Sequence, residues 1–303
     1  MTTSIPLPND YYKIKQHFFV YNVTMKNKLE CVVCDLDGSL LNDDKKVSKE
    51  DLETIRTLKN KGIKFFICTG RPFPLSKQIA YEVGFDCPTI NCNGAYGYDY
   101  LNNKVLFHTK DIDTNDVLDI YHFVKKNNYS YLIYSLEKLL FDRPDSKRTL
   151  YWKKQLEEVF SKENAFEIEY YDENKINLKD LYVMKILLPY IDQNGLDLFN
   201  KTLNKDHKFE AVFSEKDVLD ITYKGINKGY GIKKMSEIYN FNLENTLALG
   251  DNYNDLDMLN IVGYPVVTGN AKEDIKKVAK YITTSNNDSP LTNIINKLFK
   301  DIL

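Results

Sequence analysis

Short apolar segments alternate with helical segments in two separate parts of this chain, and this alternation constrains the fold more than any other feature. In the first part, apolar segments at 29–34, 63–68 and 89–92 have the length and composition of buried strands. A helix is predicted after the first of them, because Ser48 and Asp51 form a capping pattern before an apolar face. Strands and helices in this order predict a parallel, doubly wound α/β sheet with right-handed crossovers.

The same alternation returns in the last third of the chain. Helices are predicted at 228–239, 251–259, 271–279 and 290–303, with strands at 246–249 and 265–267. The region between the two parts is rich in Tyr and Lys and predicts an α+β unit of roughly 120 residues, which is a usual size for a domain. It begins with a hairpin pattern around Asn102-Asn103 and includes a predicted helix near 147–160. We therefore predict three parts: a Rossmann-like core domain of residues 28–96 and 221–303, an inserted α+β cap domain of residues 97–220, and an N-terminal extension of residues 1–27.

The composition excludes several classes of protein. The 41 basic residues are balanced by 43 acidic ones, so no polycation is available for nucleic acid. No stretch approaches the roughly 18 apolar residues that a membrane span needs. The five cysteines are odd in number and irregularly spaced, which favours reduced core thiols in a reducing compartment. We expect a cytoplasmic protein, a monomer or weak homo-oligomer, with neither nucleic acid nor a membrane as partner.

Polar clusters follow the predicted core strands or begin the core helices. Two carboxylates, Asp35 and Asp37, end the first strand, and Gly38 permits a sharp turn after them. The other clusters are Thr69-Gly70-Arg71, Lys228, and Gly250-Asp251-Asn252-Tyr253-Asn254-Asp255. Because the carboxyl ends of parallel strands share one edge of a sheet, we expect these clusters to converge there.

The residue types in these clusters indicate phosphoryl-transfer chemistry. Carboxylate oxygens without accompanying His or Cys favour Mg²⁺ over zinc, and lysine and hydroxyl donors facing such a cation suit a phosphoryl group. Under this hypothesis Asp35 attacks phosphorus and forms an aspartyl-phosphate, while Asp37 protonates the leaving oxygen and later accepts a proton from water. Thr69 and Lys228 bind the phosphoryl oxygens.

The same hypothesis assigns the metal ligands. Asp35, Asp251 and the backbone carbonyl of Asp37 bind Mg²⁺ directly, and Asp255 binds it through water. This is an all-oxygen ligand set, as Mg²⁺ prefers.

Further positions are candidates for binding the substrate or its phosphate, namely Gly70, Arg71, Asn93 and Asn254. Pairing with a core acid is an alternative for Arg71, and a turn role is an alternative for Asn93. In the middle region, Lys185 stands on an otherwise apolar strand and either faces a pocket or faces solvent. The same two alternatives hold for a basic cluster of Arg143, Lys147 and Arg148.

Taken in order, these motifs resemble those of the haloacid dehalogenase (HAD) superfamily, in particular the Cof-type phosphatases with a large α/β cap. The resemblance covers about residues 29–303 and rests on Asp35-Leu36-Asp37-Gly38-Ser39-Leu40-Leu41, Cys68-Thr69-Gly70-Arg71, Asn93-Gly94-Ala95, Lys224-Gly225-Ile226-Asn227-Lys228-Gly229 and Gly250-Asp251-Asn252-Tyr253-Asn254-Asp255-Leu256-Asp257-Met258-Leu259. It implies Mg²⁺-dependent hydrolysis of small phosphate esters beneath the inserted cap. It also implies that Lys228, rather than Lys224, is the catalytic lysine. Ser39 stands where the family usually has Thr, and it keeps the hydroxyl.

The sequence therefore predicts a Mg²⁺-dependent phosphomonoesterase that acts on sugar phosphates or similar small phosphorylated metabolites. Two alternatives stay open. A sugar phosphomutase on the same scaffold would return the phosphoryl group of Asp35 to a sugar rather than to water. A non-catalytic protein would bind or sense a phosphorylated metabolite, although binding alone would not require Asp37.

Overall fold

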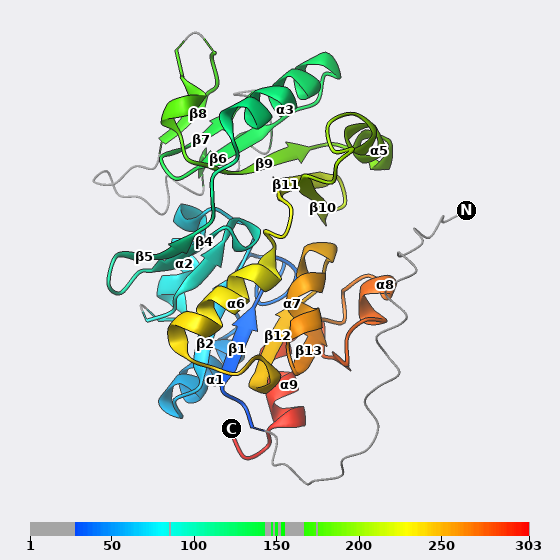
Figure 1. The fold of residues 1–303 in the computed structure, drawn as a ribbon. Coiled ribbons are helices and arrows are strands. Elements are labelled where there is room, and N and C mark those ends of the chain that lie inside the picture. Colours follow the sequence, from blue (N-terminus) through cyan, green and yellow to red (C-terminus); the bar gives the residue numbers. More distant parts are fainter. Residues whose placement is uncertain are drawn as a thin grey trace.

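The computed structural model describes residues 28–84, 86–142, 147, 149–150, 153–154, 167–173 and 175–302. It contains two β-sheets, each covered by helices, with the smaller sheet above the larger one in Figure 1. Several sequence predictions lie outside the described residues: the extension 1–27, Arg143, Arg148 and most of the predicted helix after Lys147. No helix among the described residues is long and apolar enough to cross a membrane.

The larger sheet is the predicted doubly wound core. Its strands are β1 (Cys31–Cys34), β2 (Lys64–Cys68), β3 (Thr89–Asn91), β4 (Tyr96–Asp99), β5 (Lys104–His108), β12 (Thr246–Gly250), β13 (Tyr264–Val267) and β14 (Tyr281–Ile282). They lie in the order β14-β13-β12-β1-β2-β3-β4-β5. All neighbours from β14 to β3 are parallel, and β4 and β5 add an antiparallel edge. This arrangement confirms the α/β fold class.

Helices cover both faces of the core sheet. On one face lie α1 (Lys49–Asn60), α2 (Phe73–Glu82) and α9 (Pro290–Leu298), and on the other lie α6 (Lys228–Tyr239), α7 (Leu256–Ile261) and α8 (Glu273–Lys276). The strand residues alternate accordingly. In β1, Val32 and Cys34 pack in the first layer, whereas Cys31 and Val33 pack in the second, and all four are fully buried. A strand buried on both faces is apolar throughout, as the sequence of β1 is.

The smaller sheet forms the second unit. Its strands are β6 (Leu132–Ser135), β7 (Lys138–Phe141), β8 (Glu167–Tyr170), β9 (Val183–Pro189), β10 (Phe209–Glu215) and β11 (Val218–Tyr223), in the order β10-β11-β9-β6-β7-β8. Only β7 and β8 are parallel. Helices α3 (Thr114–Lys126) and α5 (Gln193–Thr202) pack on one face. On the other face, Tyr134 and Met184 join a cluster with Leu75 and Tyr96 of the larger unit. This face therefore lies directly against the core (Figure 1).

The second sheet begins later in the chain than the predicted start of the cap at residue 97. The hairpin of β4 and β5 extends the larger sheet, with Asn91 opposite Tyr96, so the second sheet begins only at β6. The reason is the tight turn of the short helix η2 (Cys92–Gly94), in which Asn93 adopts a left-handed φ of 55° and returns the chain along β3. The predicted boundary at 220/221 divides β11, which belongs to the smaller sheet throughout.

Two helices are shorter than predicted. The segment 271–279 contains only the single turn of α8, and the terminal helix ends at Leu298 rather than running to the chain end. The remaining short 3₁₀ helices are η3 (Leu178–Asp180), η4 (Leu243–Asn245) and η5 (Tyr253–Asp255). Of these, η5 follows β12 and carries part of the site described below.

Candidate active site

The acidic residues of the first and last motifs meet where the winding of the sheet reverses. From β1 the chain builds outward through β2 and β3, and it later returns to build β12, β13 and β14 on the other side of β1. Asp35 follows β1 and Asp251 follows β12, and these two strands pair directly, with Cys34 opposite Leu249. Open α/β sheets bind ligands in the crevice at such a point.

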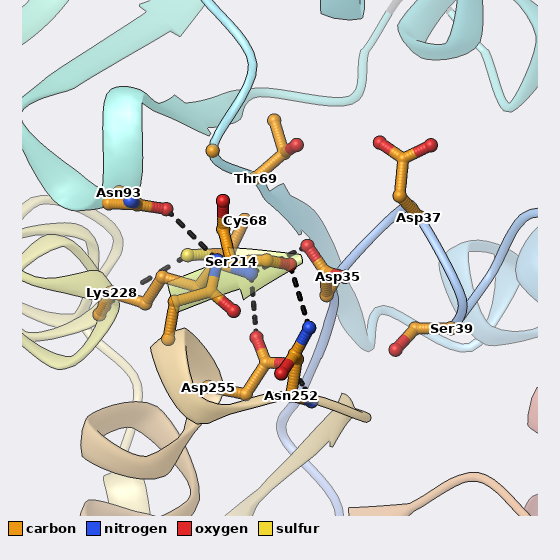
Figure 2. Close-up of polar contacts among 12 residues, drawn as sticks. Asp35, Asp37, Ser39, Cys68, Thr69, Asn93, Ser214, Lys228, Asn252 and Asp255 are labelled. Carbon is orange, nitrogen blue, oxygen red and sulfur yellow. Dashed lines mark hydrogen bonds and ion pairs between the residues drawn. The ribbon is translucent and has the colours of Figure 1, made fainter. Parts of the chain in front are cut away.

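Three carboxylates and one ammonium group form the centre of this crevice. One oxygen from each of Asp35, Asp251 and Asp255 lies within 4.8 Å of the others. The Nζ of Lys228 donates to Asp35 Oδ1 and to Asp255 Oδ1, at 2.6 Å in each case (Figure 2). The side chain of Lys228 is fully buried. If all four groups are ionised, the cluster carries two more negative charges than positive ones.

Burial and the neighbouring charges shift the pKa of Asp35, Asp251 and Lys228. Burial raises the pKa of Asp35 to about 7, against the opposing effect of Lys228, and the charge of Asp255 adds to the rise. Burial also raises the pKa of Asp251 well above its usual range, and the charges of Asp255 and Asp35 raise it further. For Lys228, burial alone would lower the pKa, but the two neighbouring carboxylates outweigh it and hold the ammonium protonated. The charges of this cluster therefore favour the binding of a further cation.

The residues present fit a hard divalent cation. The donors are carboxylate oxygens, with no His or Cys ligand in the cluster, which suits Mg²⁺ rather than zinc. Two residues of the first motif hold the Asp251 carboxylate in position. Ser39 donates to its Oδ1 at 2.9 Å, and Gly38 packs against it. A Cβ at Gly38, whose φ is +82°, would lie 2.6 Å from Asp251 Oδ2, so only glycine permits this approach. A cation bound here would neutralise the carboxylates and polarise a phosphoryl oxygen.

Asp255 has a second function in the site. Its Oδ2 accepts hydrogen bonds from the backbone N–H groups of Asp251 and Asn252, at 2.9 and 3.0 Å, while its Oδ1 contacts Lys228. Both oxygens of Asp255 are thus engaged, one by the loop that carries Asp251 and the other by Lys228. That Asp255 binds a metal through water stays a prediction.

The structure places Asp37 away from the carboxylate cluster. Its side chain points aside in Figure 2 and forms a bidentate pair with Arg71, at 2.8 Å from Nε and 2.7 Å from Nη2. Lys45 donates to the same carboxylate at 2.8 Å. Burial would raise the pKa of Asp37, but these two cations outweigh it and hold the pKa well below the usual range. Arg71, a candidate for binding phosphate, is thus paired with an acid, the alternative left open by the sequence.

The other candidate residues lie around the same crevice. Thr69 follows β2, and its Oγ1 accepts from the backbone N–H of Arg71 at 3.2 Å. Asn93 donates to Asp220 Oδ2 at 2.7 Å and accepts from Asn254 Nδ2 at 3.2 Å. The structure therefore brings all the predicted site residues to one crevice. Asn93 and Asn254 contact each other, and Asn93 contacts Asp220 of the smaller sheet, but neither bonds the cluster of Asp35, Asp251 and Asp255.

A cavity of about 510 Å³ opens above the cluster, between the two sheets. The core contributes the motif residues, and the smaller sheet contributes side chains from β6, β9, β10 and β11. The lining residues are Asp35, Asp37, Gly38, Lys45, Thr69, Gly70, Arg71, Tyr134, Lys147, Lys185, Leu187, Tyr190, Ser214, Glu215, Asp220, Asp251, Asn252 and Asn254. One hydrogen bond across the cavity, from Asn252 Nδ2 to the carbonyl of Ser214 at 2.7 Å, ties the last motif to the smaller sheet (Figure 2).

Comparison with known proteins agrees with this architecture. A family model described as haloacid dehalogenase-like hydrolase matches residues 32–295. The chain belongs to this family of hydrolases. Hydrolases of the HAD superfamily generally use a divalent metal, and the carboxylate cluster is where this one could bind it.

Relatives of this hydrolase are similar along most of their length. The pyridoxal phosphate phosphatase of Escherichia coli is 26% identical over 266 residues, which cover 87% of this chain and 96% of that protein. A 5-amino-6-(5-phospho-D-ribitylamino)uracil phosphatase of Bacillus subtilis is 25% identical over 258 residues, which cover 85% of this chain and 91% of that protein. The crystal structure of a haloacid dehalogenase-like hydrolase from Bacteroides thetaiotaomicron superposes with a TM-score of 0.73 at 26% identity, covering 90% of this chain and all of that one.

Sequence reasoning missed several residues that line the cavity of this hydrolase. Lys45 lies in the turn after β1, and Tyr134, Ser214 and Glu215 lie in the smaller sheet, where no motif marked them. Asp220 had a detectable signal, because it is a lone acid within the apolar segment 218–221, just as Lys185 is a lone base in its own strand. An isolated charge in a buried strand requires a partner, and these two are partners of each other.

Proposed function

We propose that this hydrolase is a Mg²⁺-dependent phosphomonoesterase that hydrolyses sugar phosphates or similar small phosphorylated metabolites through a phosphorylated Asp35. The observation that carries the proposal is the cluster of three carboxylates around the buried Lys228, at the base of a 510 Å³ cavity. A cavity of this volume suits a small metabolite. Membership of a hydrolase family, together with relatives that are named as phosphatases of small phosphorylated metabolites, supports the same reaction.

In the proposed reaction Asp35 is the nucleophile. Its carboxylate attacks phosphorus in line, the bond from phosphorus to the leaving oxygen breaks, and an aspartyl-phosphate forms. The side chain is held in place by Lys228 and lies at the cavity wall with 9% of its surface exposed. Thr69 and Lys228 bind the phosphoryl oxygens, and the ammonium of Lys228 reduces the repulsion between the incoming phosphate and the carboxylates.

Asp37 is the proposed proton donor to the leaving oxygen. It later takes a proton from the water that attacks the aspartyl-phosphate, and inorganic phosphate leaves. To act in this way Asp37 must separate from Arg71 and Lys45, whose charges hold it ionised in the structure. Arg71 is then available to an anionic group of the substrate. Asp35, Asp251 and the backbone carbonyl of Asp37 would hold Mg²⁺, with Asp255 acting through water.

The test is phosphate release by the full chain with Mg²⁺ over a panel of sugar phosphates, nucleotides and pyridoxal phosphate. We expect release from at least one small ester. Asp35→Asn should abolish it while leaving the fold intact, because the amide is nearly isosteric but cannot attack phosphorus. Asp44→Asn, in the exposed turn after β1, is a matched control and should retain full activity.

Three results would contradict the proposal. Turnover by Asp35→Asn would exclude the covalent mechanism. Turnover that requires a sugar bisphosphate and releases no phosphate would indicate a phosphomutase. Binding of panel members without release from any of them would indicate a sensing protein.

A further inference from the structure

The loop that carries Thr69 and Arg71 is held partly by the smaller sheet. Its three successive carbonyl groups each accept a hydrogen bond. The carbonyl of Thr69 accepts from the N–H of Asn93 at 3.1 Å, and that of Arg71 accepts from the N–H of Cys92 at 3.0 Å, so both bonds stay within the core. The carbonyl between them, on Gly70, accepts from the Nζ of Lys185 at 2.6 Å. Lys185 belongs to β9 of the smaller sheet.

Lys185 is buried together with a counter-charge. Only 2% of its side chain is exposed, and 1% of that of Asp220, whose Oδ1 lies 3.1 Å from the ammonium. Yet Asp220 Oδ1 accepts no hydrogen bond among the described residues. One of the three N–H groups of the ammonium donates to the carbonyl of Gly70, and the carboxylate of Asp220 balances its charge. The contact with the core loop is thus a hydrogen bond, whereas the contact with Asp220 Oδ1 is an ion pair.

Asp220 makes the second contact with the core. Its Oδ2 accepts from Asn93 Nδ2 at 2.7 Å, and Asn93 also bonds Asn254 of the last motif. The whole network packs against Gly70. A Cβ at Gly70 would lie 2.9 Å from Asn93 Oδ1, 3.5 Å from Asp220 Oδ2 and 3.6 Å from Lys185 Nζ. Glycine is therefore needed here for the close approach of the network and not for an unusual φ.

We propose that Lys185 and Asp220 are positioning residues that couple the smaller sheet to the loop 69–71 and to Asn93. Lys185 fixes the carbonyl of Gly70, and through it the orientation of the Thr69 hydroxyl and the Arg71 guanidinium on either side. Neither residue contacts the reacting atoms. A buried ion pair is a weak source of stability, because an apolar pair of similar volume is often as stable. Its directional contact with the loop is what an apolar pair cannot supply.

The consequence for the reaction rests on the proposed function. A displacement of about 1 Å in a group that orients the reacting phosphoryl can slow the chemical step about 100-fold. We expect Lys185→Met, which keeps the length of the side chain but loses the donor, to lower kcat about 10- to 100-fold and to change KM less than about threefold. Asp220→Asn should have a smaller effect of the same kind. The double variant should be no slower than Lys185→Met, because the two residues act as a unit.

The experiment measures both kinetics and backbone protection in the full chain. Hydrogen exchange in Lys185→Met should become at least about tenfold faster in peptides covering 69–72 and 91–94, and stay unchanged in β1 and α6. The midpoint shift that Mg²⁺ produces in thermal unfolding should equal that of the wild type. Lys138→Met is the matched control, because Lys138 lies in the smaller sheet with Glu167 and Glu169, both 2.9 Å away, as partners and does not line the cavity. It should change neither kcat nor exchange at 69–72.

Three results would overturn the proposal. The first is unchanged exchange at 69–72 in Lys185→Met, which tests the coupling even if the wild type proves not to be a phosphatase. The second is a rise in KM at constant kcat, which would make Lys185 a substrate contact. The third is faster exchange spread over the whole core sheet, which would make the pair merely structural.

Discussion

Removal of the ammonium of Lys228 should destabilise the metal-free protein and make its stability depend strongly on Mg²⁺. Lys228 is fully buried and contacts two carboxylates at 2.6 Å each. Lys228→Met keeps most of the side-chain volume but leaves Asp35 and Asp255 without their counter-charge. Breaking a buried ion pair by removing one partner costs about 3–5 kcal/mol. This is a large part of the roughly 5–15 kcal/mol by which domains are stable.

The expected change is measurable by thermal unfolding. For a unit of this size each kcal/mol moves the midpoint by about 2–4 °C, so Lys228→Met should lower it by about 6–20 °C without metal. Mg²⁺ should raise the midpoint of the variant by more than that of the wild type, because the cation becomes the only counter-charge of the cluster. Activity should be lost even with Mg²⁺, since in the proposed reaction Lys228 also binds the phosphoryl oxygens.

The matched control is a lysine that pairs with carboxylates outside the cavity. Lys138 is 20% exposed, and its partners Glu167 and Glu169 are 59% and 39% exposed, so Lys138→Met should cost no more than about 1 kcal/mol. The reasoning fails if the metal-free midpoint of Lys228→Met stays within about 2 °C of the wild type, or if Mg²⁺ stabilises both proteins equally.

Two further substitutions remove buried carboxylates. Asp251→Asn should lower activity about 100-fold and weaken the Mg²⁺-induced midpoint shift. Because burial raises the pKa of Asp251 in the folded state, the metal-free variant should also be more stable than the wild type at pH 7, with a difference that shrinks as the pH falls. Burial likewise raises the pKa of Asp51, whose Oδ2 has no hydrogen bond among the described residues. Asp51→Asn should therefore stabilise the protein by about 1 kcal/mol at pH 7 and less near pH 4, as urea unfolding at the two pH values will test.

Much of the core and its acidic centre could be predicted from the sequence, because both depend on short-range patterns. The apolar run before Asp35 marks a buried strand, and the run before Asp251 marks another. The rule that strand ends of a doubly wound sheet share one edge then brings both acids together. Lys228 was predicted at the same edge because it begins a core helix, and the family resemblance selected it over Lys224. In the structure Asn227 caps α6 by accepting from the N–H of Tyr230, so Lys228 lies in the first turn.

What could not be predicted depends on contacts between distant segments. The assignment of β4 to the core required knowing that the chain turns back after Asn91, and a hairpin pattern does not state which sheet it joins. The contact of Lys185 with Gly70 spans 115 positions and two sheets. Strand alternation indicated only that Lys185 faces either a pocket or solvent. Its contact with Gly70 depends on how the smaller sheet packs against the larger one.

The two acids of the first motif occupy opposite electrostatic environments although one residue separates them. Burial raises the pKa of Asp35 to about 7, whereas Arg71 and Lys45 hold that of Asp37 well below its usual range. Under the proposed function Asp35 must be ionised and Asp37 must carry a proton, so the raised pKa of Asp35 and the lowered pKa of Asp37 both oppose the reaction. A divalent cation favours the ionised form of Asp35, and a substrate anion that competes for Arg71 frees Asp37. Under the proposed function we therefore expect hydrolysis to need both ligands at once, because neither ligand alone shifts the pKa of both acids in the required direction.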